Sequence, residues 1–296
     1  MNPYKGLGVA MVTPFLQNGD VDYVNLELLA NHLINSGVDY LVALGTTSES
    51  PTLTDEEKHK IVRTIVEINQ NRVPVIVGVG GTSTHHIVQQ FKTFDFSGVN
   101  AILSVTPYYN KPAQSGLFEH YQELAYHAPL PIILYNVGSR TGCNMEPETT
   151  LKLAESKNII GIKEASGIMN QIMYIIKHKP KDFLVISGDD AITLPLMAVG
   201  ADGLISVVAN AFPAQIAQMV HLAQEGNFSE AAIIHNRLLD ITQACFKEGN
   251  PAGVKAFLAI QNRLEYYLRL PLTRVSKEHQ EYVKGMRYED VLLSDK

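Results

Sequence analysis

A lysine at the end of an uncharged apolar run is the feature of this sequence that most strongly suggests chemistry. Lys163 follows Ile159-Ile160-Gly161-Ile162. A lysine buried at such a position loses hydration, which disfavours its charged form and exposes a neutral amine. A neutral amine forms an imine with a carbonyl substrate, and the iminium then acts as an electron sink for carbanion formation. The alternative is a lysine paired with a strand-end acid, such as Glu164 or Glu49.

Groups that transfer protons accompany this lysine. Tyr135 lies on the preceding apolar run, so the two side chains can face one pocket. A phenol near a cationic iminium ionises more easily and can serve as general acid and base. Thr46 and Thr47 follow an earlier run, and threonines can pass a proton through their hydroxyls or hold a carboxylate with their backbone N–H groups. Taken alone, each of these residues is equally compatible with ordinary core packing or strand-end polarity.

The elements that position these residues are eight short runs rich in β-branched side chains. Several are apolar without a break, which is typical of parallel strands buried on both faces. Amphipathic helices are predicted between them, for example over residues 25–34 and 55–68, the second with Thr54 as N-cap and Glu57 three residues on. The eight predicted strands cover residues 7–12, 38–44, 74–79, 99–105, 131–137, 159–163, 183–187 and 202–208.

This alternation predicts an α/β fold, a closed (β/α)8 barrel, in which chemistry sits at the C-terminal ends of the strands. A doubly wound sheet is the competing architecture. A dinucleotide-binding site in such a sheet would need GxGxxG after the first strand, and none is present. Gly78-Val79-Gly80-Gly81 follows the third strand, but no acidic residue that could bind a ribose closes a later strand. After the eighth strand only helices are predicted, over residues 213–224, 229–246, 251–264 and 278–286. We therefore predict a barrel domain over residues 1–225 and a C-terminal helical extension over residues 226–296.

Composition argues against several other classes of protein. The net charge is −6 and no basic stripe stands out, so a nucleic-acid partner is not expected. Apolar stretches reach about eight residues, against roughly 20 needed to span a bilayer, and no signal-peptide pattern opens the chain. The two cysteines, Cys143 and Cys245, have no CxxC spacing, and the histidines form no metal-binding motif. These features predict a cytoplasmic enzyme with no membrane association, metal or cofactor.

Five motifs make the chain resemble a known family over nearly its whole length. They are GTTSES, SVTPYYNKP, LYNVGSRTG, GIKEAS and SGDD. In order and spacing they resemble the dihydrodipicolinate synthase and N-acetylneuraminate lyase superfamily. The resemblance implies that Lys163 forms a Schiff base with pyruvate and that Tyr135 donates and accepts protons.

The same resemblance implies roles for the neighbouring residues. Thr46 and Tyr109 would complete a proton relay, with Tyr109 reaching in from a neighbouring subunit. Thr47 and Ile205 would contact pyruvate, and Gly188 would line the pocket. The family also suggests a homotetramer built as a dimer of dimers.

Arg140, in Ser139-Arg140-Thr141-Gly142, separates the branches of the superfamily, because the sialic-acid lyases usually carry an uncharged residue there. An arginine binds a carboxylate in bidentate fashion. This implies condensation of pyruvate with L-aspartate 4-semialdehyde to 4-hydroxy-tetrahydrodipicolinate, in lysine and diaminopimelate biosynthesis. The alternatives are another Schiff-base lyase, such as N-acetylneuraminate lyase or a 2-keto-3-deoxy sugar-acid aldolase, and a non-catalytic keto-acid sensor, which would have lost Lys163 or Tyr135.

The sequence departs from the family at several positions. Ser48 replaces the usual glycine and would strain a tight turn if its φ is positive. Gly138 replaces a proline and should loosen the loop that carries Arg140.

The cleft that binds lysine in inhibited members of the family also differs here. In those members an acid and an asparagine at a dimer interface bind the inhibitor, and the matching positions in this chain are His86 and Thr82. Ser50 and Tyr108 match that cleft, and three residues differ: Pro51, Asp55 and Lys58. Weak or absent inhibition by lysine is therefore expected, unless Asp55 supplies the missing charge.

Overall fold

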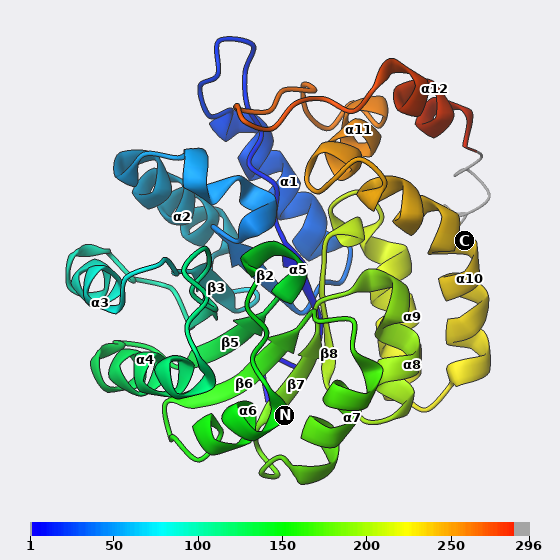
Figure 1. Ribbon diagram of the computed structural model, residues 1–296. Coiled ribbons are helices and arrows are strands. Elements are labelled where there is room, and N and C mark those ends of the chain that lie inside the picture. Colours follow the sequence, from blue (N-terminus) through cyan, green and yellow to red (C-terminus); the bar gives the residue numbers. More distant parts are fainter. Residues whose placement is uncertain (1, 287–296) are drawn as a thin grey trace.

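Eight parallel strands form a closed barrel in the computed structural model, which describes residues 2–286 (Figure 1). The strand order follows the chain, and β1 pairs with β8 to close the ring. The predicted (β/α)8 barrel is therefore confirmed. The strands are β1 (Gly6–Ala10), β2 (Tyr40–Ala43), β3 (Val75–Gly78), β4 (Ala101–Val105), β5 (Ile132–Asn136), β6 (Ile159–Glu164), β7 (Leu184–Ser187) and β8 (Gly203–Ser206).

Helices alternate with the strands and form the outer layer of the barrel (Figure 1). They are α1 (Tyr23–Asn35), α2 (Asp55–Asn69), α3 (Thr84–Thr93), α4 (Gln114–His127), α6 (Pro147–Leu153), α7 (Met169–His178), α8 (Thr193–Ala198) and α9 (Pro213–Gln224). Short helical turns occupy the loops after the strands: α5 (Gly138–Thr141), η1 (Thr46–Ser48), η2 (Ser50–Thr52), η3 (Asp190–Ile192) and η4 (Val208–Asn210).

Local sequence signals explain where several helices begin and end. The Thr54 hydroxyl accepts a hydrogen bond from the Glu57 N–H at 3.2 Å, and the Glu57 carboxylate accepts one from the Thr54 N–H at 2.9 Å. This capping box confirms the predicted start of α2. The helix predicted over residues 251–264 is shorter, because the left-handed backbone of Asn262 (φ 56°) interrupts it after Ile260.

The core has two layers because strand side chains alternate between the two faces of the sheet. Most buried apolar residues fill the space between the strands and the surrounding helices. A smaller cluster fills the barrel interior, and it includes Tyr135 and Ile205. Both faces of each strand are therefore buried, which accounts for the unbroken apolar runs in the sequence.

Closure of the barrel depends on a close approach of two backbones. A Cβ atom at Gly203 in β8 would lie 2.1 Å from the carbonyl oxygen of Gly6 in β1. Only glycine permits this contact, since any side chain at position 203 would force the first and last strands apart.

Three further helices follow α9 and lie together on one side of the barrel (Figure 1). They are α10 (Phe228–Phe246), α11 (Ala252–Ile260) and α12 (Lys277–Gly285). α10 packs against α9 and α8, α11 against α10, and α12 against α11. The division of the chain at residue 225 stays a prediction. Within residues 2–286, no helix combines the length and apolar character needed to cross a bilayer.

Candidate active site

Lys163 and Tyr135 lie side by side at the C-terminal ends of β6 and β5. The two residues are direct partners in the parallel ladder. Their side chains are 5% and 7% exposed, and the Lys163 Nζ lies 4.5 Å from the centre of the Tyr135 ring. An ammonium over a ring face is attracted by the ring quadrupole. The two predicted residues therefore meet.

Gly188, directly after β7, gives the lysine side chain its space. A Cβ at this position would lie 2.8 Å from Cε of Lys163 and 2.7 Å from Cβ of Ala165. Both distances are below those that real side chains adopt, so a larger residue would displace the lysine stem. Gly188 therefore borders Lys163 rather than only lining open space.

The acidic pair after Gly188 divides into two roles. Asp189 caps η3, since its Oδ1 accepts a hydrogen bond from the Ala191 N–H at 3.0 Å. Asp190 is buried; it accepts a hydrogen bond from the Ser206 hydroxyl and another from the Val207 N–H at 3.0 Å. Burial raises the pKa of Asp190, and the positive charge of Lys163 acts in the opposite direction. Of the two acids, only Asp189 therefore caps a helix.

Thr46 and Thr47 sit on the one-turn helix η1 that follows β2. Thr46 lines the cavity described below, whereas Thr47 is buried behind it. The Thr47 Oγ1 accepts a hydrogen bond from Nδ2 of Asn250 at 3.0 Å. Because that bond occupies a lone pair of the hydroxyl, the Thr47 proton remains available to another acceptor.

The strain expected at Ser48 falls on the next residue instead. Ser48 has no positive φ, while Glu49 adopts φ 57°. The Ser48 carbonyl accepts a hydrogen bond from the Thr13 hydroxyl at 2.8 Å. Ser48 is therefore accommodated within η1, and the condition for strain at this position, a positive φ, is not met.

Glu49 is held by a buried ion pair that sequence reasoning missed. Its Oε1 lies 2.5 Å from Nζ of Lys255 in α11, and both side chains are fully buried. Its Oε2 accepts a hydrogen bond from the Arg269 N–H at 3.0 Å. Burial lowers the pKa of Lys255 to about 8, although Glu49 favours the charged form. The sequence signal was a single lysine within residues 252–260, which are otherwise uncharged and mostly apolar.

Arg140 lies on α5, in the loop between β5 and α6. It is exposed and lines the cavity. The turn is fixed from beneath by Thr141, whose hydroxyl donates to the Cys143 carbonyl at 2.8 Å. Within residues 2–286, no carboxylate forms an ion pair with Arg140, so its guanidinium is available to an anionic ligand.

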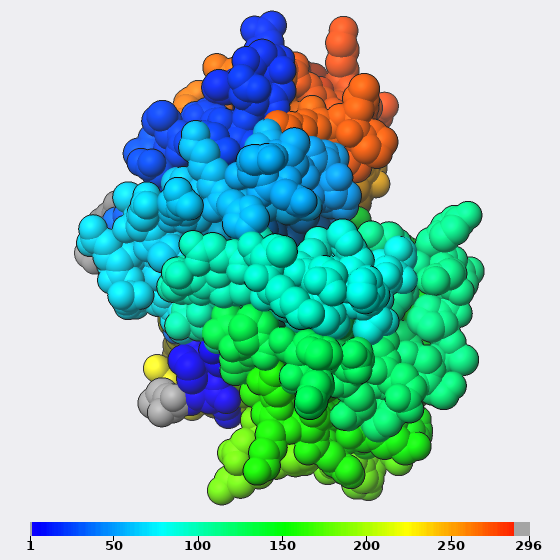
Figure 2. Space-filling model, turned by 90° about the vertical axis from the view of Figure 1, so that its left-hand side faces the viewer, coloured from blue at the N-terminus to red at the C-terminus, as the bar shows by residue number. Residues whose placement is uncertain are grey.

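The structure does not bring Tyr109 to the other predicted site residues within one chain. Tyr109 is 90% exposed and adopts φ 71°, whereas Tyr108 lines the cavity. Figure 2 shows a segment in the teal-green of the loop after β4 projecting from the side of the molecule. Ile205, in contrast, is fully buried in β8 and belongs to the interior cluster that contains Tyr135.

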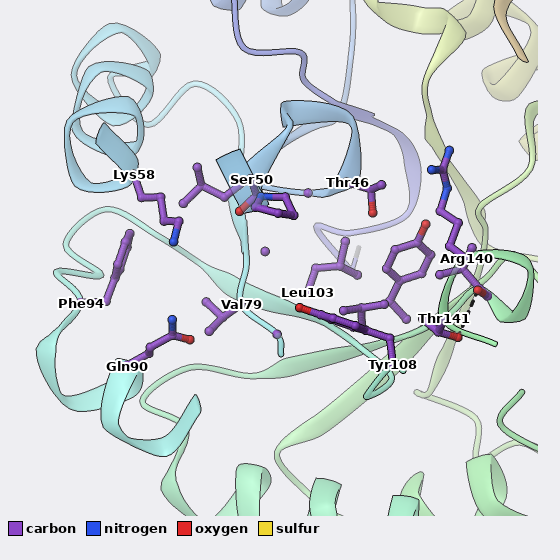
Figure 3. Close-up of a pocket in the computed structure, with 18 of the residues that line it drawn as sticks. Thr46, Ser50, Lys58, Val79, Gln90, Phe94, Leu103, Tyr108, Arg140 and Thr141 are labelled. Carbon is purple, nitrogen blue, oxygen red and sulfur yellow. Dashed lines mark hydrogen bonds between the residues drawn. The ribbon is translucent and has the colours of Figure 1, made fainter. Parts of the chain in front are cut away.

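A cavity of about 420 Å³ opens at this end of the barrel. Thr46 and Arg140 lie at one end of it, and Lys58, Gln90 and Phe94 lie at the other (Figure 3). Tyr135 forms part of its wall. The first end brings together a phenol, a hydroxyl and a guanidinium; the Lys163 amine is not part of the cavity wall but lies against the ring of Tyr135, which is. That set can hold an anionic carbonyl compound, convert it to an imine and move protons around the new bond.

The far end of the cavity carries its own polar groups. Lys58 Nζ lies 3.0 Å from Asp55 Oδ1, and the ring of His59 stacks on Phe94 with centroids 4.4 Å apart. The hydrogen bond from Lys58 lowers the pKa of Asp55. His86, in the first turn of α3, is exposed.

Comparison with known proteins agrees with this geometry. The sequence profile of the Dihydrodipicolinate synthetase family matches residues 3–287. A 4-hydroxy-tetrahydrodipicolinate synthase from Parabacteroides distasonis is 50% identical over 269 residues, which cover 90% of this chain and 91% of that protein. The solved structure of the dihydrodipicolinate synthase (DHDPS) from Cyanidioschyzon merolae with lysine bound shares 38% identity with this chain. The TM-score is 0.92, and the match covers 96% of this chain and 97% of that one. A monomeric dihydrodipicolinate synthase variant shares 40% identity with a TM-score of 0.93, covering 98% and 96%. The chain belongs to the dihydrodipicolinate synthetase family.

Proposed function

We propose that this enzyme condenses pyruvate with L-aspartate 4-semialdehyde to give 4-hydroxy-tetrahydrodipicolinate, in lysine and diaminopimelate biosynthesis. The observation that carries the proposal is the buried amine of Lys163 against the ring of Tyr135, beside a cavity that Arg140 also lines. Relatives named 4-hydroxy-tetrahydrodipicolinate synthase, at up to 50% identity over most of the chain, support it.

In this mechanism the neutral amine of Lys163 attacks the keto carbon of pyruvate. Tyr135 and Thr46 pass protons while the carbinolamine loses water to give the iminium. Thr47 and Ile205 contact pyruvate. Loss of a methyl proton gives an enamine, whose carbon attacks the aldehyde of the second substrate. The substrate amine then replaces Lys163 at the former keto carbon, which closes the ring and frees the enzyme. The overall reaction releases one water.

Trapping of the imine tests the nucleophile. Borohydride with pyruvate should add mass to one peptide, the one that contains Lys163, and mass spectrometry of the digest identifies it. Lys163→Arg should abolish the label because a guanidinium stays protonated. Lys255 is the rival, since it is also buried and its pKa is lowered to about 8. A label on Lys255, or on no lysine, rejects the mechanism.

A second assay separates the synthase from the lyases. The enzyme should form product from pyruvate and aspartate semialdehyde and should not cleave N-acetylneuraminate.

Arg140 is proposed to bind the carboxylate of aspartate semialdehyde. Arg140→Ala should leave the rate of imine formation with pyruvate largely unchanged and lower kcat/KM for the semialdehyde by roughly 10- to 150-fold, the equivalent of a charge-assisted contact worth about 1.5–3 kcal/mol. Arg237→Ala, on the exposed surface of α10, is the matched control. Unchanged semialdehyde kinetics in Arg140→Ala would assign this arginine another task.

The active unit is proposed to be a dimer, and the molecule a dimer of such dimers. Tyr109 is almost fully exposed in a left-handed conformation that a tyrosine adopts only at a cost. This geometry suits a side chain that completes a neighbour's site. Four large apolar side chains on and around α7 and α8 are also exposed, and they offer a second contact. They are Ile168, Met173, Tyr174 and Val199.

Replacement of Tyr109 tests the shared site. Tyr109→Phe should lower kcat more than it raises KM for pyruvate, because it removes a proton carrier and leaves the carboxylate contacts in place. Tyr126 is also highly exposed and lies on α4, away from the loop of Tyr109. The control variant Tyr126→Phe should leave kcat and KM unchanged. A second experiment measures the oligomeric state by sedimentation and the activity of the enzyme over the same dilution series. A monomer with full activity contradicts the proposal.

Inhibition by lysine is proposed to be weak or absent. His86 and Thr82 leave no acid at the matching positions, and Asp55, the alternative source of charge, is already paired with Lys58 at 3.0 Å. Loss of one charge-assisted contact weakens binding by roughly 10- to 150-fold. Lysine titrated into the synthase assay should therefore give little inhibition below millimolar concentration. His86→Glu with Thr82→Asn should increase it. Strong, saturable inhibition of the unaltered enzyme at sub-millimolar lysine would show the prediction to be wrong.

We also propose a cytoplasmic location. Cys143 and Cys245 are both free thiols in the fold. Reduced thiols and an absence of disulfides are typical of the cytosol. Fractionation of cells with an antibody to the enzyme tests this, and recovery in a secreted or membrane fraction would contradict it.

A further inference from the structure

The residues directly after Tyr135 and Lys163 form a second pair on the opposite side of the barrel wall. Asn136 and Glu164 are partners in the ladder between β5 and β6, and both are fully buried. Because strand side chains alternate, this pair faces the helix layer while Tyr135 and Lys163 face the interior. Whatever fixes Asn136 and Glu164 therefore also fixes the strand ends that carry the reacting groups.

The Glu164 carboxylate is held by hydrogen bonds from neighbouring N–H groups of the described residues. Oε1 accepts from the Ser166 N–H at 2.8 Å, Oε2 accepts from Gln171 Nε2 at 3.1 Å, and Asn136 Nδ2 lies 3.2 Å from both oxygens. None of these donors is charged, and within residues 2–286 no lysine, arginine or histidine forms an ion pair with Glu164.

The orientations of the two amides are set by other bonds. Asn136 Oδ1 accepts from the Met145 N–H at 3.0 Å, and Gln171 Oε1 accepts from Asn144 Nδ2 at 2.9 Å. The NH2 groups of both amides must therefore point toward Glu164. An ionised carboxylate is the side chain that presents acceptors in both positions. A glutamine at 164 would set its own NH2 group against one of these donors.

This carboxylate joins the segments that carry three proposed site residues. Asn136 follows Tyr135, Glu164 follows Lys163, and the Asn144–Met145 segment closes the loop that carries Arg140. A buried charge satisfied only by neutral donors is costly, and burial raises the pKa of Glu164 while these hydrogen bonds lower it. Apolar packing would fill the same space at less cost. Stability therefore does not explain the buried Glu164 carboxylate, whereas the fixed positions of the strand ends that it joins do.

We infer that Glu164 is a positioning residue for the imine chemistry: its carboxylate locks the ends of β5 and β6 together so that the Lys163 amine faces Tyr135. The inference rests on the proposed function. It assigns Glu164 no contact with substrate. It implies that loss of the carboxylate slows imine formation without removing the site.

The primary test measures the rate and the extent of pyruvate trapping separately. Glu164→Gln should slow trapping by about 10- to 100-fold, since a misplacement of about 1 Å can cost that much. The final amount of label at Lys163 should stay at one per active site, and KM for pyruvate should change little because the Thr46–Thr47 turn is untouched. Glu148→Gln, the same change on the exposed surface of α6, is the control. A purely structural role would lower the melting temperature and leave the trapping rate of the folded protein unchanged, which overturns the inference.

A double-mutant cycle tests the contact itself. An aspartate at position 136 would set an oxygen against Asn144 Oδ1 and the Met145 carbonyl, which now accept from Asn136 Nδ2, so alanine is used there. Because the bond between the two side chains is already weakened in either single variant, Asn136→Ala with Glu164→Gln should slow trapping by less than the product of the two single effects. A slowing equal to the product of the two single effects rejects the proposed lock.

A further variant keeps the inference testable if Glu164→Gln does not fold. Gln171→Met removes one donor to the carboxylate at similar volume and should slow trapping several-fold, because Glu164 then loses part of what holds it. An unchanged rate in this variant also overturns the inference. Failure to trap pyruvate in the unaltered enzyme is a distinct result, because it removes the proposed function itself.

Discussion

The lateral register between β5 and β6 is the constraint on which the site depends. Backbone hydrogen bonds of the parallel ladder place Tyr135 opposite Lys163 and Asn136 opposite Glu164. A shift of one residue in either strand would exchange the faces and send the lysine into the helix layer. Closure of the barrel removes the free edges at which such slippage is easiest. The amine and the phenol therefore meet because of backbone geometry, and their own attraction is secondary.

Buried charge behind the cavity is handled in two different ways. Glu49 and Lys255 neutralise each other in a direct ion pair with both side chains fully buried. Within the described part of the chain, Glu164 accepts hydrogen bonds from neutral donors alone, and its charge is spread over several of them. The Glu49–Lys255 pair is hydrogen-bonded but also has a Coulomb attraction, which falls slowly with distance, whereas Glu164 has hydrogen bonds alone, and these weaken steeply with angle. The more directional arrangement lies next to Lys163, the lysine proposed to react, where orientation matters most.

Much of this fold and site could be predicted from local sequence. Unbroken apolar runs identified the strands, and Lys163 and Tyr135 stood out because polar residues at strand ends gather at one face of a barrel. The Glu49–Lys255 pair, 206 residues apart in sequence, could not be predicted, because no local pattern specifies such a partner. The same holds for Asn250 and Thr47. Whether Ser48 is strained was left open for a related reason: the turn could place its positive φ on either of two neighbours, and the packed structure puts it on Glu49.

The long-range partners also bear on how the chain is divided. The boundary predicted at residue 225 would separate the Thr46–Glu49 turn from Asn250, Lys255 and Arg269, which all bond to it. Without Lys255, the buried Glu49 carboxylate would lose its counter-charge, and leaving one such charge unpaired costs about 3–5 kcal/mol. That is a large share of the stability of an ordinary domain. The segment after the barrel therefore supports the candidate site although none of its described residues lines the cavity, since Asn250, Lys255 and Arg269 hold the turn that carries both threonines.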